Sequence, residues 1–431
     1  MIPNPSTPAA PTRVAIIGLG YVGLPLALAF TRSGGTVIGI DTDPEKSRII
    51  GRCESYLRHI PSSSVRDAVA TGRFTATTDI GQAGSVDAVI ICVPTPLTAQ
   101  HAPDLSYVLA TGAALAPVLC KGMLVVLEST TYPGTTAVDL RQCLEAGSGM
   151  AAGRDFHLAF SPEREDPGNV TSLERIPKVV GGLTPECLRR ATALYAAVVP
   201  KVVEVSSCDA AEATKLLENI FRSVNIALVN ELKVIYAAMG IDIWEVIAAA
   251  STKPFGFMPF FPGPGLGGHC IPIDPFYLSW KAKEFGQTAR FIELAGEINT
   301  AMPRHVVSRI AAALNDRGRP LRGSEILLLG LAYKKNVDDD RESPTYAIWD
   351  LLNASGAIVS YHDPHVPEVR PGRTHARFAG TRSVPVEDRF DAIVVCTDHD
   401  EYREQDFSSF RAAVIDTRNA ISRRPSGYYR A

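Results

Sequence analysis

Val14-Ala-Ile-Ile17 followed by Gly18-Leu-Gly-Tyr-Val-Gly23 has the form of a buried strand, a tight turn and the start of a helix. Each glycine suits a different need: Gly18 makes the tight turn, Gly20 lets the backbone approach a pyrophosphate, and Gly23 lets the helix pack closely on the strand. The free amides at the start of that helix would then face the phosphates. The segment therefore predicts the first strand and helix of a dinucleotide-binding fold.

An acidic residue follows at the spacing that such a fold requires. Asp41 closes the apolar run Thr36–Ile40, about twenty residues beyond the glycines. A carboxylate at this place accepts hydrogen bonds from the 2′-hydroxyl of a ribose and repels a 2′-phosphate, so NAD is favoured over NADP. Glycines without a ligand are the alternative, but strand, turn, helix and Asp41 together favour a dinucleotide site.

Short apolar runs and segments of helical length alternate beyond this motif, and the alternation returns after Pro303. Continuous apolar strands separated by helices indicate parallel sheets that are covered by helices on both faces. The string VAIIGLGY is similar to ILLLGLAY, and DAVIICVPTP is similar to DAIVVCTDHD. This similarity is either a weak internal repeat of a nucleotide-binding half or the likeness of any two buried parallel strands, and the strings do not decide between them. The later runs are Ala88–Val93, Leu124–Leu127, Glu325–Leu329, Ile358–Tyr361 and Asp391–Cys396.

A single helical pattern runs from Ala210 to Met239 with apolar residues at spacings of three and four, and Gly240 follows as a stop signal. Because about thirty residues is long for a globular helix, we expect it to link two lobes and to contribute to a subunit interface. The predicted fold class is α/β, with two Rossmann-like, doubly wound parallel-sheet domains joined by a long central helix and an all-α middle domain. We expect a disordered leader over 1–12, an NAD-binding domain over 13–207, a central helical dimerisation domain over 208–305 and a C-terminal Rossmann-like domain over 306–431.

The composition is that of an ordinary folded protein. The 431 residues suggest roughly two or three domains, and 46% hydrophobic with 21% charged residues exclude a disordered or fibrous chain. Lys and Arg number 43 against 46 Asp and Glu, so no excess of positive charge predicts binding to nucleic acid or to a membrane. The 8 cysteines form no CxxC pair, which argues against a zinc site and a disulfide framework. Val14–Phe30 is uncharged, but its glycines and proline fit a strand, turn and helix better than a signal peptide, so we expect a cytoplasmic protein.

A second glycine-rich segment, Pro262-Gly-Pro-Gly-Leu-Gly-Gly268, leads directly into His269-Cys270, and Asp274 follows four residues after the cysteine. Its glycines and prolines predict a loop whose backbone can lie against a ligand such as a diphosphate or a sugar. A thiol in such a loop is a candidate nucleophile, whereas a thiol in a strand is usually a packing residue. The loop alone leaves both interpretations of Cys270 open, and His269 is more simply a loop donor than a base.

Four further polar residues stand where chemistry is possible. Lys215 and Asn219 are four apart on the long helix, so they are either a solvated surface stripe or a cation and an amide that stabilise an oxyanion. Their spacing alone favours the surface stripe. Glu163 lies in an acidic turn, and Thr130 follows the end of a strand, where open α/β sheets place their ligands.

Taken together, these strings resemble the nucleotide-sugar 6-dehydrogenase family, which includes UDP-glucose, GDP-mannose and UDP-N-acetylhexosamine dehydrogenases. The resemblance spans Arg13 to Arg418 and rests on GLGYVGLPLA, ESTTYPGTT, SPE, ATKLLEN, GLGGHCIPID and GLAYKKNVDDDRESP, in the family's order. It implies NAD bound to the N-terminal lobe, a UDP-sugar bound to the C-terminal lobe, chemistry between the lobes, and a homodimer or higher homo-oligomer. It implies no metal, and a product that serves polysaccharide biosynthesis.

The resemblance also implies roles for residues at the matching positions. Cys270 matches the nucleophile, and Lys215 with Asn219 matches the pair that holds the developing oxyanion. Glu163 matches the general base for thioester hydrolysis, while Thr130 and Asp274 match residues that position a water. The implied NAD-binding residues are Gly18, Gly20, Tyr21, Val22, Gly23, Asp41, Lys46, Thr95, Thr130 and Arg341. The implied substrate-binding residues are Glu163, Arg164, Lys215, Asn219, Phe261, Gly263, Gly265, Gly267 and Lys334.

Two departures from the family bear on the substrate. UDP-glucose members commonly carry a lysine where this chain has Ile273, and a second Glu where it has Pro167. The strings GLGGHCIPIDPFYL and RFIELAGEINTAMP are most similar to the branch that oxidises UDP-N-acetylglucosamine, which is the expected substrate; UDP-glucose and UDP-N-acetylmannosamine are alternatives. Two other classes stay open: a two-electron β-hydroxyacid dehydrogenase, which pairs a helix Lys with an Asn but needs no catalytic Cys, and an NAD-binding regulator without chemistry.

Overall fold

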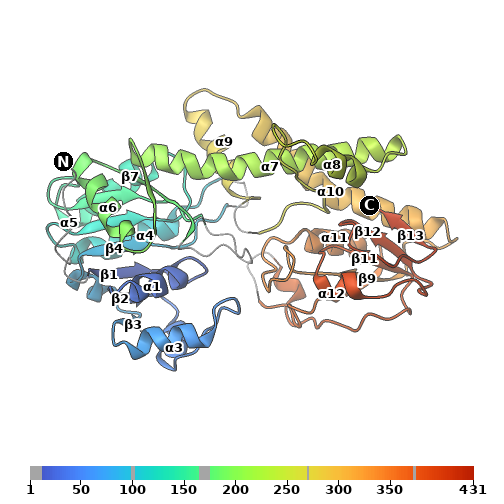
Figure 1. The fold of residues 1–431 in the computed structure, drawn as a ribbon, viewed down its shortest axis with the longest axis horizontal. Helices are drawn as coiled ribbons and strands as arrows, with labels where there is room; N and C mark the ends of the chain where they lie inside the picture. The colour runs from blue at the N-terminus through green and yellow to red at the C-terminus, as the bar shows by residue number, and fades with distance from the viewer. Residues whose placement is uncertain (1–11, 99–101, 165–174, 269–270, 372–374) are drawn as a thin grey trace. The chain divides into compact units, whose positions relative to one another are not determined.

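The computed structural model describes residues 12–98, 102–164, 175–268, 271–371 and 375–431, which are called the described residues below. The chain divides into two compact units (Figure 1). The first unit comprises Met1–Glu218 and Trp280–Phe285, and the second comprises Asn219–Ser279 and Gly286–Ala431. The predicted disordered leader lies outside the described residues, apart from Thr12.

Eight strands form the sheet of the first unit: β1 (Arg13–Ile17), β2 (Thr36–Ile40), β3 (Phe74–Thr77), β4 (Ala88–Ile91), β5 (Leu124–Leu127), β6 (His157–Phe160), β7 (Lys178–Gly182) and β8 (Val202–Val205). Their order is β3-β2-β1-β4-β5-β6-β7-β8, and neighbouring strands are parallel except for β6 and β7. The order reverses direction between β1 and β4, which is the doubly wound arrangement. Open sheets of this kind bind ligands outside the carboxyl ends of the strands at that reversal.

The helices of the first unit are α1 (Gly23–Arg32), α2 (Pro44–Gly51), α3 (Ser62–Ala70), α4 (Ser106–Leu115), α5 (Arg141–Ser148) and α6 (Pro185–Ala196), with the shorter η1 (Ile80–Ser85), η2 (Ala116–Val118) and η3 (Thr135–Leu140). They cover both faces of the sheet (Figure 1). In β1, Val14 and Ile16 belong to a core with α1, α3 and α6, whereas Ala15 and Ile17 belong to a core with α4 and α5. Because both faces are buried, the strand is an unbroken apolar run in the sequence.

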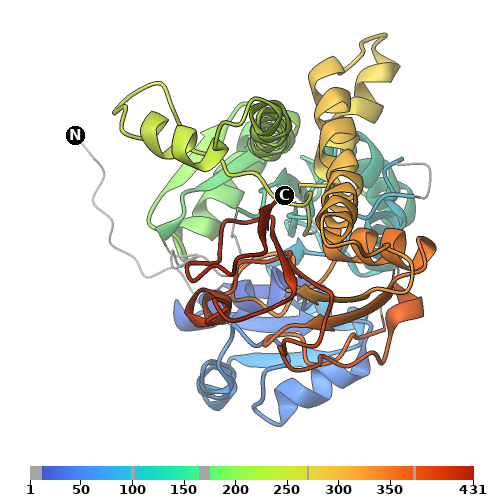
Figure 2. The same ribbon diagram turned by 90° about the vertical axis from the view of Figure 1, so that its right-hand side faces the viewer.

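Five parallel strands form the sheet of the second unit: β9 (Glu325–Leu329), β10 (Ile358–His362), β11 (Ala392–Val395), β12 (Ala413–Asp416) and β13 (Tyr428–Arg430). Their order is β10-β9-β11-β12-β13. The helices α10 (Arg290–Asn315) and α11 (Pro344–Ala354) share one core with this sheet, and α12 (Asp400–Glu404) shares the other (Figure 2). Two further helices are α8 (Ile243–Ala250) and α9 (Asp274–Glu284), and the short η5 spans Ala376–Phe378.

Helix α7 (Cys208–Ala238) is the predicted long helix, and its residues divide between the two units after Glu218. Helix α10 contains Pro303 and continues beyond it, so the expected domain boundary between residues 305 and 306 lies inside this helix. Two Rossmann-like parallel sheets and a helical middle region confirm the predicted α/β fold class. Within the described residues, none of the helices combines the length and the apolar character needed to cross a bilayer.

Candidate active site

The glycine motif connects β1 to α1, as predicted. Gly18 has a φ of 94°, and a Cβ on Gly18 or Gly23 would clash with a backbone carbonyl oxygen. At Gly20, by contrast, a Cβ would meet no atom of the other described residues within 4 Å, so packing does not require a glycine there. The missing side chain leaves the backbone open to a ligand, as pyrophosphate binding requires. The residues of this turn therefore fit a dinucleotide.

Asp41 stands directly after β2 and holds the glycine turn. Its Oδ2 accepts hydrogen bonds from the Leu19 amide and the Lys46 ammonium, both at 2.8 Å, and its Oδ1 accepts one from the Asp43 amide at 3.0 Å. An ionised carboxylate offers about four acceptor positions, so one remains for a ribose hydroxyl. The predicted ribose contact of Asp41 is thus compatible with its geometry. Among the other predicted cofactor residues, Tyr21 stacks on His59, Val22 precedes α1, and Thr95 is buried.

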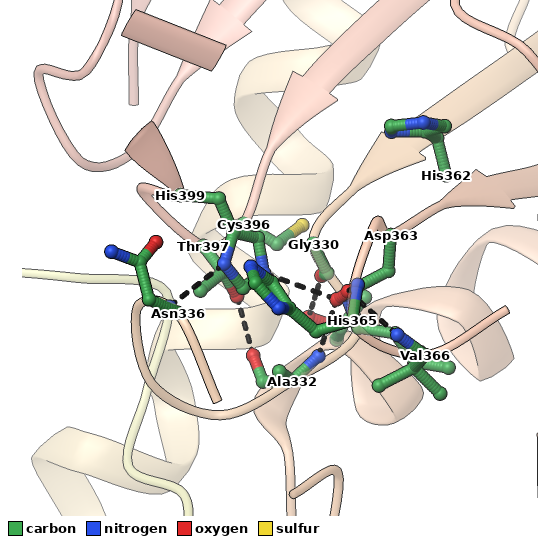
Figure 3. Close-up of polar contacts among 12 residues, drawn as sticks. Gly330, Ala332, Asn336, His362, Asp363, His365, Val366, Cys396, Thr397 and His399 are labelled. Atoms are coloured by element: carbon green, nitrogen blue, oxygen red, sulfur yellow. Dashed lines mark hydrogen bonds and ion pairs between the residues drawn. The ribbon is translucent and has the colours of Figure 1, made fainter. Parts of the chain in front are cut away.

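The second unit also has a glycine after its first strand and an aspartate after the next, but this aspartate differs from Asp41 in its hydrogen bonds. Gly330 follows β9 with a φ of 91°, and Asp363 follows β10, as Gly18 and Asp41 follow the corresponding strands of the first unit. The Asp363 carboxylate accepts hydrogen bonds from four backbone amides at 2.6 to 3.0 Å and from His399 Nε2 at 3.1 Å (Figure 3). These donors use all its acceptor positions, so none remains for a ribose. The shared geometry supports the interpretation of an internal repeat, in which only the first unit has kept an available carboxylate.

His399 uses both of its ring nitrogens in this network. Its Nδ1 accepts a hydrogen bond from the Asn336 amide at 2.9 Å, so the proton is on Nε2, which donates a hydrogen bond to Asp363. Burial by itself raises the pKa of Asp363, but His399 and the backbone amides lower it by more. The ligand atoms of His365, His399 and Glu401 lie within 4.8 Å of one another, yet His399 has no nitrogen left for a metal. We interpret the cluster as a hydrogen-bond network that ties the loop after β9 to the end of β10.

Two predicted catalytic residues meet in the first unit. Glu163 is 7% exposed and Lys215 is 6% exposed, and Lys215 Nζ donates a hydrogen bond to the Glu163 carbonyl at 2.5 Å. Asn219 stands one helical turn further along α7, in the second unit, where its amide donates to Asp274 Oδ2 at 2.5 Å and its Oδ1 accepts from Arg222. Because Lys215 and Asn219 are both buried, a solvated surface stripe is excluded.

Buried ion pairs around Glu163 were missed by the sequence analysis. Lys178, at the start of β7, has its Nζ 3.2 Å from Glu163 Oε2 and 2.9 Å from Glu128 Oε2. The Tyr195 hydroxyl donates to the other Glu128 oxygen at 2.5 Å. Burial alone lowers the pKa of Lys178, but the two carboxylates raise it well above its usual value. The signal in the sequence that could have revealed this network is the lysine at the start of the otherwise apolar run KVVGG, Lys178–Gly182.

Glu212, near the start of α7, holds the loop that carries Thr130. It accepts the Thr136 hydroxyl at 2.7 Å and the amides of Thr136 and Gly134, both at 2.9 Å. Burial raises the pKa of Glu212 to about 7, although these hydrogen bonds lower it. Thr130 itself lies three residues beyond β5, at the carboxyl edge of the sheet where the sequence places it.

In the second unit, the glycine-rich loop packs against the loop that carries Lys334. A Cβ on Gly267 or Gly268 would come within 2.6 or 2.8 Å of the Tyr333 side chain, and the Gly268 amide donates to the Arg341 carbonyl at 3.1 Å. These approaches require glycine, because a side chain would displace the neighbouring loop. The structure therefore brings together two segments that the sequence analysis assigned to the substrate.

Further predicted residues have partners within their own units. Arg164 pairs with Glu218 and Arg341 with Asp339, both at 2.6 Å, Phe261 stacks on Trp244, and Gly265 has a φ of 141°. His269, Cys270 and Pro167 lie outside the described residues. The assignment of Cys270 as the nucleophile therefore stays a prediction.

Three profiles of one family match successive parts of the chain. The UDP-glucose/GDP-mannose dehydrogenase family matches with its NAD binding domain at residues 12–199, its central domain at 209–301 and its UDP binding domain at 327–423. A UDP-N-acetyl-D-mannosamine dehydrogenase of Salmonella typhimurium is 37% identical over 410 residues, which cover 91% of this chain and 94% of that protein. A UDP-N-acetyl-D-glucosamine 6-dehydrogenase of Pseudomonas aeruginosa is 35% identical, and the match covers 93% of each protein.

A solved structure shows the same fold. The UDP-D-ManNAc dehydrogenase from Pyrococcus horikoshii has a TM-score of 0.86 and 33% identity, and the match covers 97% of this chain and 98% of that one. The matched NAD binding domain contains the glycine turn and Asp41, whose geometry fits a dinucleotide. The chain therefore belongs to the UDP-glucose/GDP-mannose dehydrogenase family and is an NAD-dependent nucleotide-sugar dehydrogenase.

Proposed function

We propose that this enzyme oxidises the C6 hydroxyl of an N-acetylated UDP-hexosamine to the carboxylate, in two steps of two electrons each. The observation that carries the proposal is the similarity, over more than 90% of the chain, to relatives named for UDP-N-acetylmannosamine and UDP-N-acetylglucosamine. UDP-N-acetylglucosamine is the substrate expected from the sequence, and UDP-N-acetylmannosamine is the second candidate, which the 37% identical relative favours. A buried Ile273, where UDP-glucose members carry lysine, supports an N-acetylated sugar over glucose.

The proposed chemistry explains why a cysteine is needed. Two NAD molecules, bound one after the other at the Gly18–Gly23 turn, would each accept one hydride. The alcohol first loses a hydride and a proton to give an aldehyde, which has no readily transferable hydride. Addition of the Cys270 thiolate gives a thiohemiacetal, and loss of its hydride and of the hydroxyl proton leaves a thioester. Water activated by Glu163 then hydrolyses the thioester, which releases the carboxylate and restores the thiol.

The buried polar groups suit the charges of this reaction. Each step builds negative charge on the oxygen at C6, which the Lys215 ammonium and the Asn219 amide would stabilise. Asp274 fixes the orientation of that amide through its 2.5 Å hydrogen bond. Lys178 balances the charge of Glu163, so that a carboxylate can be kept inside the protein.

A screen of NADH release tests the substrate assignment. The purified enzyme is supplied with NAD and, separately, UDP-N-acetylglucosamine, UDP-N-acetylmannosamine, UDP-N-acetylgalactosamine, UDP-glucose and GDP-mannose. We expect an N-acetylated UDP-sugar to give the highest kcat/KM, by at least about tenfold over UDP-glucose, since a pocket difference of one small group is worth roughly 1–3 kcal/mol. A preference for UDP-glucose or GDP-mannose would contradict the assignment.

A homodimer is also proposed, on the basis of apolar side chains that the second unit exposes. Leu228 and Ile235 are seven residues apart and share one face of α7, Met239 directly follows the helix, and all three are exposed. Phe255 and Met258, in the loop after α8, are exposed as well. An apolar surface of this kind is unusual on a monomer, which supports a second copy of the chain as its partner.

The dimer is tested by the molar mass of the protein in solution. Light scattering is expected to give twice the mass of one chain for the wild type, and the mass of one chain for Leu228→Glu, because a buried unpaired carboxylate opposes association. The control Lys121→Glu, at an exposed position of the first unit, should remain dimeric. A wild-type protein with the mass of one chain would refute the proposal.

The cytoplasmic location expected from the sequence is retained as a proposal. Its support is that Val14–Phe30, the uncharged stretch that resembles a signal-peptide core in length, forms β1 and α1 and contributes to the core of the first unit. A segment built into the fold in this way is unsuited to removal as a leader.

A further inference from the structure

Lys233 on α7 is a buried lysine without a hydrogen-bond partner. Its side chain is 6% exposed, and its Nζ contacts no acceptor among the described residues. Burial, together with the positive charges of Arg418 and Arg309, lowers the pKa of Lys233 to about 7, and only Asp416 acts in the opposite direction. An unpaired buried ammonium costs several kcal/mol, so this arrangement is unfavourable in the chain alone.

Asp416 does not supply the missing counter-charge. Its Oδ1 accepts the Arg418 amide at 2.9 Å, and its Oδ2 accepts the Ile421 amide at 3.0 Å and the Tyr428 hydroxyl at 3.1 Å. These three hydrogen bonds help to shape the turn after β12, and none of them comes from Lys233. It moderates the pKa of Lys233 from a distance but does not bind the ammonium.

Arg418 is a second cation beside the same surface, and its side chain is partly buried. Its Nε donates to the Cys396 carbonyl at 2.9 Å, and its two terminal nitrogens make no hydrogen bond to the described residues. Burial also lowers the pKa of Arg418. A Cβ on Gly263 would clash with one of those terminal nitrogens, so the glycine-rich loop lies directly against them.

A hydrogen bond ties Lys233 to this loop through its own helix. The Gly263 amide donates to Asn230 Oδ1 at 2.9 Å, and Asn230 precedes Lys233 by three residues, on the same face of α7. Three elements of the second unit thus converge: α7 with Lys233, the glycine-rich loop with Gly263, and the end of β12 with Arg418. The convergence places two cationic side chains beside a glycine backbone, which is the chemistry of an anion site.

The position of the site favours a phosphate as the anion. Arg418 follows the carboxyl end of β12, the edge at which parallel α/β sheets bind ligands, and it lies inside the matched UDP binding domain at residues 327–423. Lysine and arginine are the side chains that bind phosphoryl oxygens, and a glycine loop allows the backbone to approach a diphosphate. A nucleoside diphosphate would provide the negative charge that the chain lacks here.

We propose that Lys233 Nζ binds a phosphoryl oxygen of the substrate's diphosphate, in a site that it forms with Arg418 and the Gly263 loop. The identity of the ligand rests on the proposed UDP-sugar function. The role of Lys233 is to bind the nucleotide and not to take part in the oxidation, so it sets KM rather than the rate of chemistry.

Diphosphate binding at this site should depend on pH with a definite sign. Without nucleotide, the pKa of Lys233 is lowered to about 7, and a bound diphosphate would raise it, because it stabilises the charged form. Binding is therefore tightest where Lys233 is already protonated, below pH 7, and weakens as the pH rises above 7. Burial lowers the pKa of neighbouring His305 to about 4, so it stays neutral in this range. The other charged groups facing the site are Arg309, Asp398, Asp416 and Arg418.

Calorimetric binding of UDP to the full-length protein tests the proposal without requiring turnover. We expect Lys233→Met to raise the Kd for UDP about ten- to a hundredfold at pH 7, as the loss of a charge-assisted hydrogen bond predicts. The wild-type Kd should rise between pH 7 and pH 9, whereas the Kd of the variant should stay flat. The control Lys121→Met, at an exposed position, should match the wild type in both respects.

Two further measurements separate binding from a structural role. Thermal unfolding of Lys233→Met without nucleotide should occur at the same or a higher temperature, because the variant removes an unpaired buried charge. Its KM for NAD should be unchanged, since the cofactor turn lies in the first unit. A Kd within twofold of the wild type would overturn the proposal, as would a loss of UDP binding that accompanies a lower unfolding temperature. A change of molar mass with an unchanged Kd would assign Lys233 to a subunit contact and would also overturn it.

These results are separable from a failure of the proposed function. UDP carries no sugar and no reaction occurs, so a wrong sugar assignment or a wrong role for Cys270 leaves the expected Kd values in place. If the wild type itself does not bind UDP, both proposals fall together.

Discussion

Replacement of Cys270 by serine is expected to abolish steady-state NADH release with the preferred UDP-sugar, with a loss in kcat of at least about a thousandfold. The first oxidation needs only the alcohol, the cofactor and the groups that stabilise the oxyanion, so each active site should still form one aldehyde. The second oxidation requires a covalent adduct, and a serine hydroxyl is a far weaker nucleophile than a thiolate. The reaction should therefore stall after a single turnover of the first step.

The measurement is the absorbance of NADH under steady-state conditions, with Cys120→Ser as the matched control. Cys120 is an exposed cysteine of the first unit, and its replacement should leave the rate within about twofold of the wild type. A Cys270→Ser enzyme that continues to turn over would indicate the two-electron β-hydroxyacid dehydrogenase alternative. A wild type that binds NAD but oxidises none of the sugars tested would indicate the regulator.

Replacement of Lys178 by methionine is expected to destabilise the protein by about 3–5 kcal/mol at pH 7. The substitution leaves Glu128 and Glu163 buried without the ammonium that lies 2.9 and 3.2 Å from them. Burial already raises the pKa of Glu128, and the loss of Lys178, which lowers it, would raise it further. The free energy of unfolding, measured by urea denaturation, reports the loss directly.

The stability of the Lys178→Met variant should depend on pH with a predictable sign. At low pH, a carboxyl group whose pKa is raised in the folded state is protonated in both the folded and the unfolded protein. It therefore does not lower the free energy of unfolding at low pH. The deficit should therefore be smallest below the unfolded-state pKa of glutamate, about 4.3. It should grow as the pH rises from there to the raised folded-state value, and stay constant above it.

Two controls accompany the Lys178 prediction. Lys201→Met, at an exposed position before β8, should change the free energy of unfolding by less than about 0.5 kcal/mol. The double variant Glu128→Gln/Lys178→Met should recover part of the stability, because it removes one of the uncompensated charges. A Lys178→Met protein that unfolds within about 1 kcal/mol of the wild type would contradict the interpretation of a buried ion-pair network.

The features that were predictable from the sequence are those with a local pattern. Val14–Ile17 is apolar at each position because both faces of the strand are buried, and the Gly18–Gly23 turn needs glycine for contacts within a few residues. Spacing alone could not place Lys215, since a helix face is equally regular on a surface and in a core. Its burial against the Glu163 carbonyl follows from a contact 52 residues distant in the chain.

The features that the sequence did not reveal depend on contacts between distant residues. In the sequence, Lys178 is a single charge at the edge of an apolar run. Its role follows from its ion pair with Glu128, which lies 50 residues earlier. The sequence alone is compatible with Lys233 on the exposed face of an amphipathic helix. In the structure, the hydrogen bond between Asn230 and Gly263 shows that this face is covered. Asp363 matches Asp41 in sequence position, and only its five hydrogen-bond donors distinguish a saturated carboxylate from an available one.

The number of NADH molecules released per molecule of sugar tests the central claim most directly. A limiting, accurately known amount of the preferred UDP-sugar is consumed to completion with excess NAD, and the products are identified by mass spectrometry. Four-electron oxidation in one site predicts two NADH for each sugar and a uronic acid as the only sugar product. One NADH for each sugar, with an aldehyde or ketone as the product, would contradict it.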